Sequence, residues 1–468
     1  MARLLIVTDG LRSVVYPAVE LGRRLAAAGH AVTIAGPSSA RDPAERLGLA
    51  YRPLAPSRLP DFAVRDARRG LLDRLRHLGA RRADALESLA TDDFVATLRA
   101  VDPELVLLDG ELHAQIVVAL GRFPAASGRV VLLNSFCAVW RRPGLPPPHR
   151  LVRPGIGWRG SRPSIALLWL ALRLRKAWRR RAQGLRRIGC DLASLLHHLA
   201  RVHGVDLRRE IDTGHWLIPW TYRRLPVFSL HSRAFDFPHE PPPQVTYLGP
   251  MMLRARGGTP TDARVEQLLA ARRADPSLRL LYAAFGSAFT ADRRLLRALV
   301  HVVDERPHWR LLISLGGTFE PEELERQLGP LPERVLAARW LPQLRVLRRA
   351  DVAIVHGGIN TIDECVLHGV PMLVYCGFET DMAGNAMRVE HWSLGLVGDP
   401  RRDDSAAMRG HLDRLLDPPP HRSVFRKRVA AMRRHYLADR RERVAERAVA
   451  RQLADASASP RAERETPQ

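Results

Sequence analysis

The chain has 468 residues, which is more than one hydrophobic core normally serves, so we expect two domains. Its formal net charge is +24, and nearly all of the basic residues are arginine. No nucleic-acid-binding motif accompanies this charge, so we expect no nucleic-acid partner. The four cysteines show neither a CxxC pair nor metal-ligand spacing, which argues against a disulfide framework and against a zinc site.

The sequence contains no secretory signal and no apolar run long enough to span a bilayer, so we expect a cytoplasmic protein. One region leaves peripheral membrane association open. No acidic residue occurs from Arg141 to Cys190, and the helical pattern at 165–187 combines tryptophans with a dense run of arginines. Such a helix can lie on an anionic membrane surface or face an acidic acceptor. A solvated helix is the plainer alternative.

Apolar strand patterns alternate with helical patterns through the first half of the chain. The runs "ARLLIVTDG", "AVTIAGP", "PELVLLDG" and "GRVVLLNS" predict buried strands, with helical spacing between several of them. This alternation is typical of βαβ units in a parallel sheet. We predict one doubly wound α/β domain over residues 1–230, interrupted by a basic helical insertion at about 141–190.

A proline cluster in "DFPHEPPPQVTYLGPMM" ends this pattern, so we predict a linker at 231–250. The alternation restarts with "LRLLYAAFGS", "WRLLISLGG", "RVLAARWLP", "ADVAIVHGG" and "VPMLVYCG". These runs predict a second doubly wound domain over 251–418. We expect mixed-charge helices at 419–455 and a disordered tail at 456–468.

Small polar turns follow three of these strands: "FGS", "LGGT" and "HGGINT". Open α/β sheets bind ligands at the carboxyl ends of their strands, so two such domains can share a cleft. Glycine permits close backbone approach, and the N–H groups at a helix start attract phosphate. His356 can donate a hydrogen bond to a diphosphate, and Glu364, four residues after Asn360, can accept from sugar hydroxyls. The pattern predicts a nucleoside-diphosphate site, with a tight structural turn as the alternative.

Residues 334–395, from "RVLAARWLPQ" through "HGGINTIDE" to "GNAMRVEHWSLG", resemble the donor-binding signature of the family 1 nucleotide-sugar glycosyltransferases. The resemblance to this family is weaker over the rest of the chain. The resemblance implies the GT-B fold, in which two Rossmann-like domains face each other across a cleft. It implies inverting transfer of a sugar from a UDP- or dTDP-sugar donor to a hydroxylated small molecule, lipid or natural product. We expect no metal or other cofactor, because no Asp-x-Asp motif ends a strand.

Position by position, the resemblance implies roles for residues of the second domain. Trp340 would stack on the nucleobase, and Gln343 would bind the base or ribose. His356 would hold the diphosphate with residues 360–361, and Glu364 would bind the ribose hydroxyls. Trp340 as a core residue and Gln343 as a helix start are the structural alternatives. The implied donor site comprises Gly286, Ser287, Trp340, Gln343, His356, Gly357, Gly358, Asn360, Thr361, Glu364, Asp381 and Met382.

The sugar-binding part of the signature departs from the family pattern, which has Asp-Gln before a downstream Asn-Ala. Counting back from Asn385 places Asp381 and Met382 at this pair, so the Asp is kept and the Gln is lost. Counting from Pro371 places Thr380 and Asp381 there instead. Either alignment leaves the identity of the sugar open.

A sharper departure lies in the first domain. The family usually has Gly-His-x-x-Pro after the first strand, and that His is the general base for the acceptor hydroxyl. In "SVVYP", Val14 stands at the His position, while the partner Asp maps to Asp109. General-base catalysis is worth about 10² to 10⁴-fold, so the loss matters. Asp9, Asp109 or His113 can replace the base, the acceptor can be acidic enough to need none, or the protein binds without turnover. A plain core or surface histidine is the alternative for His113.

Two further functions share this fold and remain open: a non-catalytic auxiliary sugar-nucleotide-binding homologue, and a sugar-nucleotide epimerase. The aromatic residues of the first domain suggest an apolar or amphiphilic acceptor. The residues concerned are Phe136, Trp140, Trp158 and Trp169.

Overall fold

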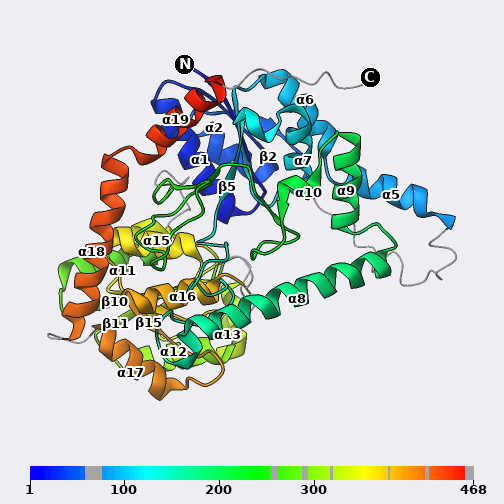
Figure 1. Cartoon of the computed structure of the whole chain (residues 1–468). Helices are drawn as coiled ribbons and strands as arrows, with labels where there is room; N and C mark the ends of the chain where they lie inside the picture. Colours follow the sequence, from blue (N-terminus) through cyan, green and yellow to red (C-terminus); the bar gives the residue numbers. More distant parts are fainter. Residues whose placement is uncertain are drawn as a thin grey trace.

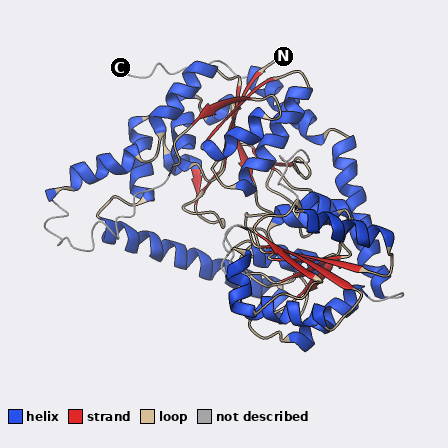
Figure 2. Cartoon of the chain, turned by 180° about the vertical axis from the view of Figure 1, so that it is seen from behind, coloured by secondary structure: helices blue, strands red, loops and turns tan. Residues whose placement is uncertain are grey.

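The computed structural model contains two parallel β-sheets, each enclosed by helices (Figure 1). The structure describes residues 1–57, 76–253, 262–286, 293–316, 320–377, 380–416 and 421–458, and side chains are described within these ranges except at 421–423. Figure 2 shows the two sheets from behind, with helices on both faces of each. The prediction of two doubly wound α/β units is therefore confirmed.

The first sheet has seven parallel strands in the order β3-β2-β1-β4-β5-β8-β9. Alternate residues of β1 enter different cores: Leu5 packs in one hydrophobic cluster and Leu4 in another. Because both faces are covered, the central strands are continuously apolar. The strands are β1 (Arg3–Val7), β2 (Ala31–Gly36), β3 (Ala50–Pro53), β4 (Leu105–Asp109), β5 (Val130–Asn134), β8 (Val227–Ser229) and β9 (Val245–Tyr247).

Most of the first-domain helices cover this sheet, and a short hairpin adds β6 (Ile211–Asp212) and β7 (Thr221–Tyr222). The helices are α1 (Arg12–Ala27), α2 (Arg41–Glu45), α5 (Leu78–Glu87), α6 (Thr91–Val101), α7 (His113–Arg122), α8 (Arg162–Arg187), α9 (Leu192–Val202) and α10 (Leu207–Glu210).

Two predictions need correction in this half of the chain. The basic helical insertion expected at 141–190 is helical only over α8. Residues 141–161 are mostly loop, because prolines at 143 and 146–148 interrupt the helical pattern. The predicted linker at 231–250 contains β9, which pairs in parallel with β8 at the edge of the first sheet. A three-residue edge strand next to prolines leaves too short a pattern to predict.

The second sheet has six parallel strands in the order β12-β11-β10-β13-β14-β15. The sequence pattern did not reveal β15, which has only three residues. The strands are β10 (Arg279–Ala284), β11 (Trp309–Ser314), β12 (Val335–Ala338), β13 (Val352–Val355), β14 (Met372–Val374) and β15 (Gly395–Val397). The helices are α11 (Ala263–Ala274), α12 (Arg293–Asp304), α13 (Pro321–Leu328), α14 (Gln343–Leu347), α15 (Ile359–His368), α16 (Met382–His391) and α17 (Ser405–Leu416).

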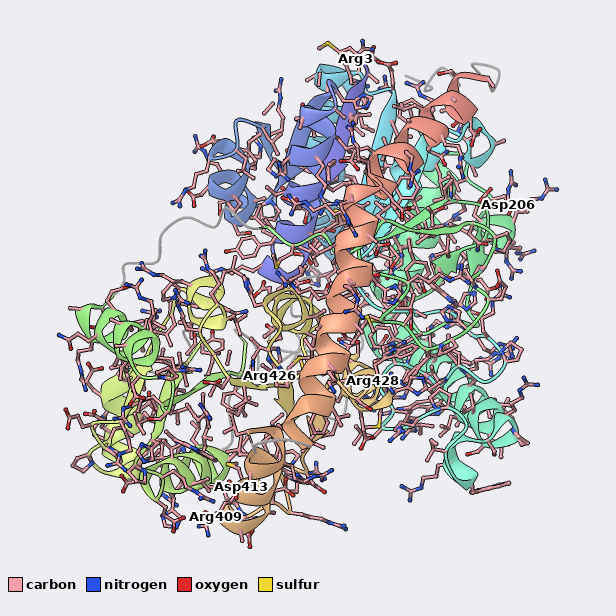
Figure 3. The ribbon with its side chains drawn as sticks, turned by 90° about the vertical axis from the view of Figure 1, so that its left-hand side faces the viewer. Arg3, Asp206, Arg409, Asp413, Arg426 and Arg428 are labelled. Carbon is pink, nitrogen blue, oxygen red and sulfur yellow. The ribbon has the colours of Figure 1, made fainter. Side chains whose placement is uncertain are left out.

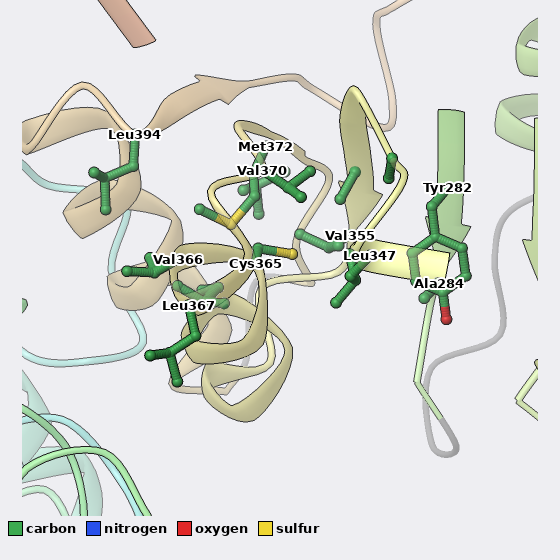
Figure 4. Close-up of a cluster of buried hydrophobic side chains, with 14 of the residues drawn as sticks. Tyr282, Ala284, Leu347, Val355, Cys365, Val366, Leu367, Val370, Met372 and Leu394 are labelled. Carbon is green, nitrogen blue, oxygen red and sulfur yellow. The ribbon is translucent and has the colours of Figure 1, made fainter. Parts of the chain in front are cut away.

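Helix α15 is fixed in position by the core of the second domain. Figure 4 shows Cys365 and Val366 of this helix among Val355, Met372 and other apolar side chains of the same cluster. Burying such side chains stabilises the fold by about 1.5–3 kcal/mol each. The start of α15 is therefore held rigidly at the carboxyl end of β13.

The last two helices return the chain to the first domain. Helix α18 (His421–Arg441) runs along both domains in Figure 3, and its Arg426 donates to Asp351 at 3.0 Å. Ala445 and Val449 of α19 (Val444–Ala458) pack into a core of the first sheet. The disordered tail predicted from residue 456 is corrected at its start, because α19 continues to Ala458. Residues 459–468 lie outside the described residues.

A buried charged cluster joins the two domains. Both ring nitrogens of His231 face oxygen acceptors, with Nδ1 2.8 Å from Asp363 Oδ2 and Nε2 2.9 Å from Ser135 O. Because a neutral imidazole can donate from only one nitrogen, this geometry requires the protonated ring. Burial alone lowers the pKa of His231, but the hydrogen bond and charge of Asp363 raise it above its ordinary value. Tyr436 of α18 donates to the other Asp363 oxygen at 2.7 Å.

Candidate active site

The stretch "VHGGINTIDE" forms the turn from β13 to α15. Gly357 has φ +92°, a conformation that favours glycine. A Cβ atom at Gly358 or Gly286 would lie only 2.5 or 2.7 Å from Nε2 of His356. The two glycines therefore make room for the imidazole ring, which is a second reason for glycine beside the predicted close approach to a phosphate.

His356 is buried, and its Nδ1 lies 3.4 Å from the carbonyl oxygen of Ala284. Burial lowers its pKa to about 4, so the ring is neutral at pH 7. A proton on Nδ1, shared with this carbonyl, leaves Nε2 as an acceptor. Donation from Nε2 to a phosphate oxygen, as expected from the sequence, requires the other tautomer.

The N-terminus of α15 presents backbone donors. The first hydrogen bond within the helix runs from Ile362 N to Gly358 O, so the preceding N–H groups have no partner within the helix. No side chain caps this end. Asn360, which lies with Thr361 in the first turn, donates instead to the carbonyl oxygen of Ser13 in the first domain at 2.9 Å. The helix end can thus hold an anion beside the junction of the two domains.

Gln343 and Glu364, each predicted to bind the nucleoside, lie side by side. Gln343 Nε2 donates to the carboxylate of Glu364, and Gln343 Oε1 accepts from Tyr282 at 2.9 Å. Trp340 is half-buried, and the guanidinium of Arg12 lies 4.4 Å from the centre of its ring. Sequence reasoning missed Arg12, which covers one face of the side chain predicted to stack on a nucleobase.

The start of α16 carries Asp381 and Met382 and is tied to the same turn. Asn385 Nδ2 contacts both Asp381 Oδ2, at 2.8 Å, and Gly357 O, at 3.0 Å. Burial raises the pKa of Asp381 above its ordinary value. A Cβ at Gly357 would lie 2.9 Å from Met382 O, so the turn and α16 pack closely.

On the first-domain side of the candidate active site, the polar side chains are carboxylates. Asp109 ends β4, where it is buried and accepts from Glu111 N at 3.0 Å through Oδ1. Its Oδ2 has no partner among the described residues. Burial raises the pKa of Asp109 to about 7, although the hydrogen bond from the Glu111 backbone opposes this shift.

Glu111 is the functional candidate that sequence reasoning missed. Its side chain is exposed to solvent, yet the surrounding protein, Asp9 and Asp381 all raise its pKa. Asp9 belongs to the first domain and Asp381 to the second, so Glu111 lies within reach of carboxylates from both. The signal was present in "LVLLDGEL", where a second carboxylate follows the strand end.

Two other residues of this region, Val14 at the usual base position and His113, are buried. Val14 is buried in α1. His113 is buried at the start of α7, with Nε2 3.1 Å from Ile218 O and Nδ1 3.3 Å from the Tyr222 hydroxyl. Burial lowers its pKa to about 4. Because both nitrogens are engaged inside the core, the geometry favours the structural alternative for this histidine.

A largely apolar pocket, partly open to solvent, begins beside these carboxylates. Trp140 lines it, but the other aromatic residues suggested for the acceptor do not. Trp169 is buried on the inner face of α8, Trp158 is exposed, and Phe136 packs against Trp216. Lining residues include Gly110, Asn134, Trp140, His215, Leu217 and Tyr222.

Three further features concern one predicted donor-site residue, metal binding and membrane-spanning helices. Ser287 follows Gly286 and lies outside the described residues. Within the described ranges, no group of three His, Cys, Asp or Glu side chains is arranged to hold a metal ion. None of the described helices is long and apolar enough to cross a bilayer.

Comparison with known proteins gives this geometry a family context. Residues 318–459 match the family model "Erythromycin biosynthesis protein CIII-like, C-terminal domain". The oleandomycin glycosyltransferase of Streptomyces antibioticus is 29% identical over 156 residues, which cover 33% of this chain and 35% of that protein. The sequence match therefore spans about a third of the length of this relative.

Solved structures extend the comparison to nearly the whole chain. The glycosyltransferase of kitacinnamycin superposes with a TM-score of 0.66 at 22% identity, covering 97% of this chain and 99% of the other. The glycosyltransferase VinC, solved in complex with dTDP, gives 0.61 at 20% identity with the same coverages.

These matches define a protein with the GT-B fold, as the resemblance implied. The C-terminal part of the chain is also similar in sequence to proteins of bacterial natural-product biosynthesis, among them a glycosyltransferase.

Proposed function

We propose that the protein is an inverting glycosyltransferase that moves a sugar from a nucleoside-diphosphate donor, UDP- or dTDP-linked, to a hydroxylated apolar acceptor. One observation carries the proposal: the uncapped start of α15 meets the first domain through the Asn360–Ser13 hydrogen bond. This hydrogen bond joins a helix end that can hold an anion to the domain that carries Asp9, Asp109 and Glu111. The related VinC structure contains dTDP, which supports a nucleoside-diphosphate ligand.

Donor binding in this proposal uses the second domain. The N–H groups at the start of α15 and the Nε2–H tautomer of His356 hold the diphosphate, while Glu364 and Gln343 bind the nucleoside. Preorganised donors at the departing diphosphate stabilise the charge that develops there. We propose that no metal or other cofactor takes part, and a rate unchanged by EDTA is the expected result.

The proton of the acceptor hydroxyl goes to a first-domain carboxylate, because Val14 cannot accept it. Glu111 is the exposed carboxylate, and its raised pKa brings it closer to neutrality, where general bases act best. Asp109 fixes the backbone of Glu111 through the Glu111 N–H. Asp9 raises the pKa of both residues through its charge.

The acceptor site is the pocket that begins at Gly110, one residue from Glu111. Its lining is largely apolar, with Trp140, Leu217 and Tyr222 among the larger side chains. We expect a flat or extended apolar acceptor with one reactive hydroxyl near Gly110.

A donor screen tests the proposal. Purified protein is incubated with UDP-, dTDP- and GDP-sugars, and binding and nucleotide release are measured with and without lipophilic hydroxylated acceptors. We expect acceptor-dependent release with one donor, and loss of binding in His356→Ala. If no sugar nucleotide binds, or if His356→Ala binds normally, the proposal fails.

Two other functions give different results in the same screen. A non-catalytic auxiliary protein, suggested by Val14, would bind donor without acceptor-dependent release. An epimerase, suggested by carboxylates from both domains around Glu111, would change the sugar nucleotide without any acceptor. Nuclear magnetic resonance of the sugar nucleotide distinguishes these outcomes.

A further inference from the structure

Helix α8 exposes a long apolar stripe. Its large apolar side chains point outward at positions separated by three, four, four and seven residues, which places them on one helix face. They are between 47% and 82% exposed. The stripe consists of Leu167, Leu170, Leu174, Trp178 and Leu185. In Figures 1 and 2, α8 runs along the edge of the molecule.

The opposite face of α8 anchors the helix to the first domain. Ile165 and Trp169 are buried in a small apolar cluster. Lys176 also turns inward, and its Nζ donates to His215 O at 2.7 Å and to Leu217 O at 2.5 Å. Buried contacts therefore hold α8 to the first domain as far as Lys176, and the stripe continues beyond this residue to Leu185.

Arginines flank the apolar stripe on both sides. At 100° per residue, six of them lie about 100 to 140° from the line through Leu174, while Arg181 lies within the stripe. The segment 141–190 contains no acidic residue. In the described part of the chain, none of the six forms an ion pair with a carboxylate. They are Arg173, Arg175, Arg179, Arg180, Arg186 and Arg187.

We propose that α8 is an interfacial helix that binds the surface of an anionic lipid bilayer. An apolar stripe between two basic flanks fits a helix lying in the membrane plane, with its leucines among the acyl chains and its arginines at the phosphates. The 26 residues span about 39 Å, so the contact is extended. Trp178 sits on the stripe with an apolar ring and a polar N–H, which suits the boundary between lipid and water.

Charge selects this occupant over a second copy of the chain. Two stripes packed face to face would bring arginine flanks against arginine flanks, and like charges in contact oppose association. An anionic bilayer supplies both an apolar layer and the matching negative charge.

This contact would bring the lipid surface close to the apolar pocket. His215 and Leu217, whose carbonyl groups accept from Lys176, also line that pocket. Only the diameter of α8, about 10 Å with side chains, would then separate the bilayer from the pocket-lining loop. Lipid binding itself does not depend on the proposed transferase activity and can be tested without it.

Co-sedimentation of the full chain with vesicles tests the proposal. We expect at least about tenfold stronger binding to phosphatidylcholine vesicles containing 30% phosphatidylglycerol than to phosphatidylcholine alone, weakened by salt. Leu170→Gln/Leu174→Gln/Trp178→Gln should weaken binding to the anionic vesicles at least about tenfold. The matched control, Val202→Gln/Val424→Gln, also replaces exposed apolar residues without changing charge and should bind normally.

The control separates the stripe from the net charge of +24, which attracts anionic vesicles by itself. Equal binding by the triple variant and the native chain would show that charge alone acts, and would overturn the proposal. Absence of binding by the native chain would do the same. A lipid-free dimer that the triple variant disperses would assign the stripe to a second copy instead. Trp178→Phe provides a second readout, because it should lose part of the fluorescence blue shift seen with vesicles.

Discussion

The two sides of the candidate active site differ in how their polar groups are held. On the second-domain side, His356, Gln343 and Glu364 are buried or half-buried and bonded to other protein groups. On the first-domain side, Asp109 has an oxygen without a described partner, and Glu111 is exposed. The first arrangement fixes geometry, whereas the second raises carboxyl pKa values. This contrast suits one side to binding a donor and the other to accepting a proton.

The largest expected effect comes from disturbing the fixed side. Gly286→Ala would place a Cβ 2.7 Å from His356 Nε2, at φ +75°. We expect nucleotide affinity to fall by about 100-fold or more, because the imidazole must move and about 1.4 kcal/mol corresponds to each tenfold step. Isothermal titration with UDP and dTDP measures the loss.

Gly329→Ala is the matched control for this experiment. Gly329 has φ +88°, so a side chain is similarly strained there, but no atom lies within 4 Å of the added Cβ. Its nucleotide affinity should stay within about twofold of the native value. Equal losses in both variants would show that backbone strain, and not the His356 pocket, controls binding.

The next effect tests the proton-accepting side. Glu111→Gln should lower kcat by about 100-fold while donor affinity stays unchanged, because general-base catalysis contributes about 10² to 10⁴-fold. Glu45→Gln, at an exposed carboxylate on α2, is the control. Normal turnover by Glu111→Gln would remove Glu111 from the mechanism and leave an acidic acceptor as the better account.

The pH dependence sharpens the same test. A base must be ionised, so kcat/KM should rise with pH, through the raised pKa of Glu111. Asp109, with a pKa of about 7, should add an inflection near neutrality that Asp109→Asn abolishes. An activity that falls as pH rises through this range would contradict carboxylate catalysis.

A moderate effect is expected at the buried cluster that joins the two sides. His231→Gln removes the protonated partner of Asp363 and should destabilise the fold by about 3 kcal/mol. Because the folded-state pKa of His231 is raised, its contribution is complete below its ordinary value of about 6.5 and disappears as pH rises through the folded-state pKa.

Urea unfolding between pH 5.5 and 9 measures this contribution. The difference in unfolding free energy between native chain and variant should shrink with rising pH. A difference that grows with pH would contradict a charged His231.

The smallest effect concerns Arg12, the first-domain residue that reaches the donor side. An exposed cation–π contact is worth about 0.5–1 kcal/mol. If the nucleobase needs the ring face that Arg12 covers, Arg12→Ala should raise nucleotide affinity by about two- to fivefold. Arg12→Lys, which keeps the charge, should change it less. Weaker binding in Arg12→Ala would mean that Arg12 supports the nucleotide.

The sequence by itself determined the two doubly wound domains, because continuous apolar strands alternating with helical patterns have few other solutions. It also placed the turn at 356–361, since glycines, a histidine and helix-start residues are contiguous there. Resemblance to a family implied nucleoside-binding roles for Gln343 and Glu364, and the structure places the two side chains in contact.

Only the tertiary structure decided which residues form the first-domain side of the candidate site and which face of α8 is exposed. Glu111 became a candidate because folding places it near Asp9 and Asp381, which are far away in sequence. Which nitrogen of His356 carries the proton depends on its contact with the Ala284 carbonyl. One face of the Trp340 ring is covered by the Arg12 guanidinium. No local sequence pattern contains either contact. For α8, the sequence pattern predicted a charged helix, but burial of Trp169 and Lys176 decided which face is exposed. Long-range packing, and not local propensity, fixes such features.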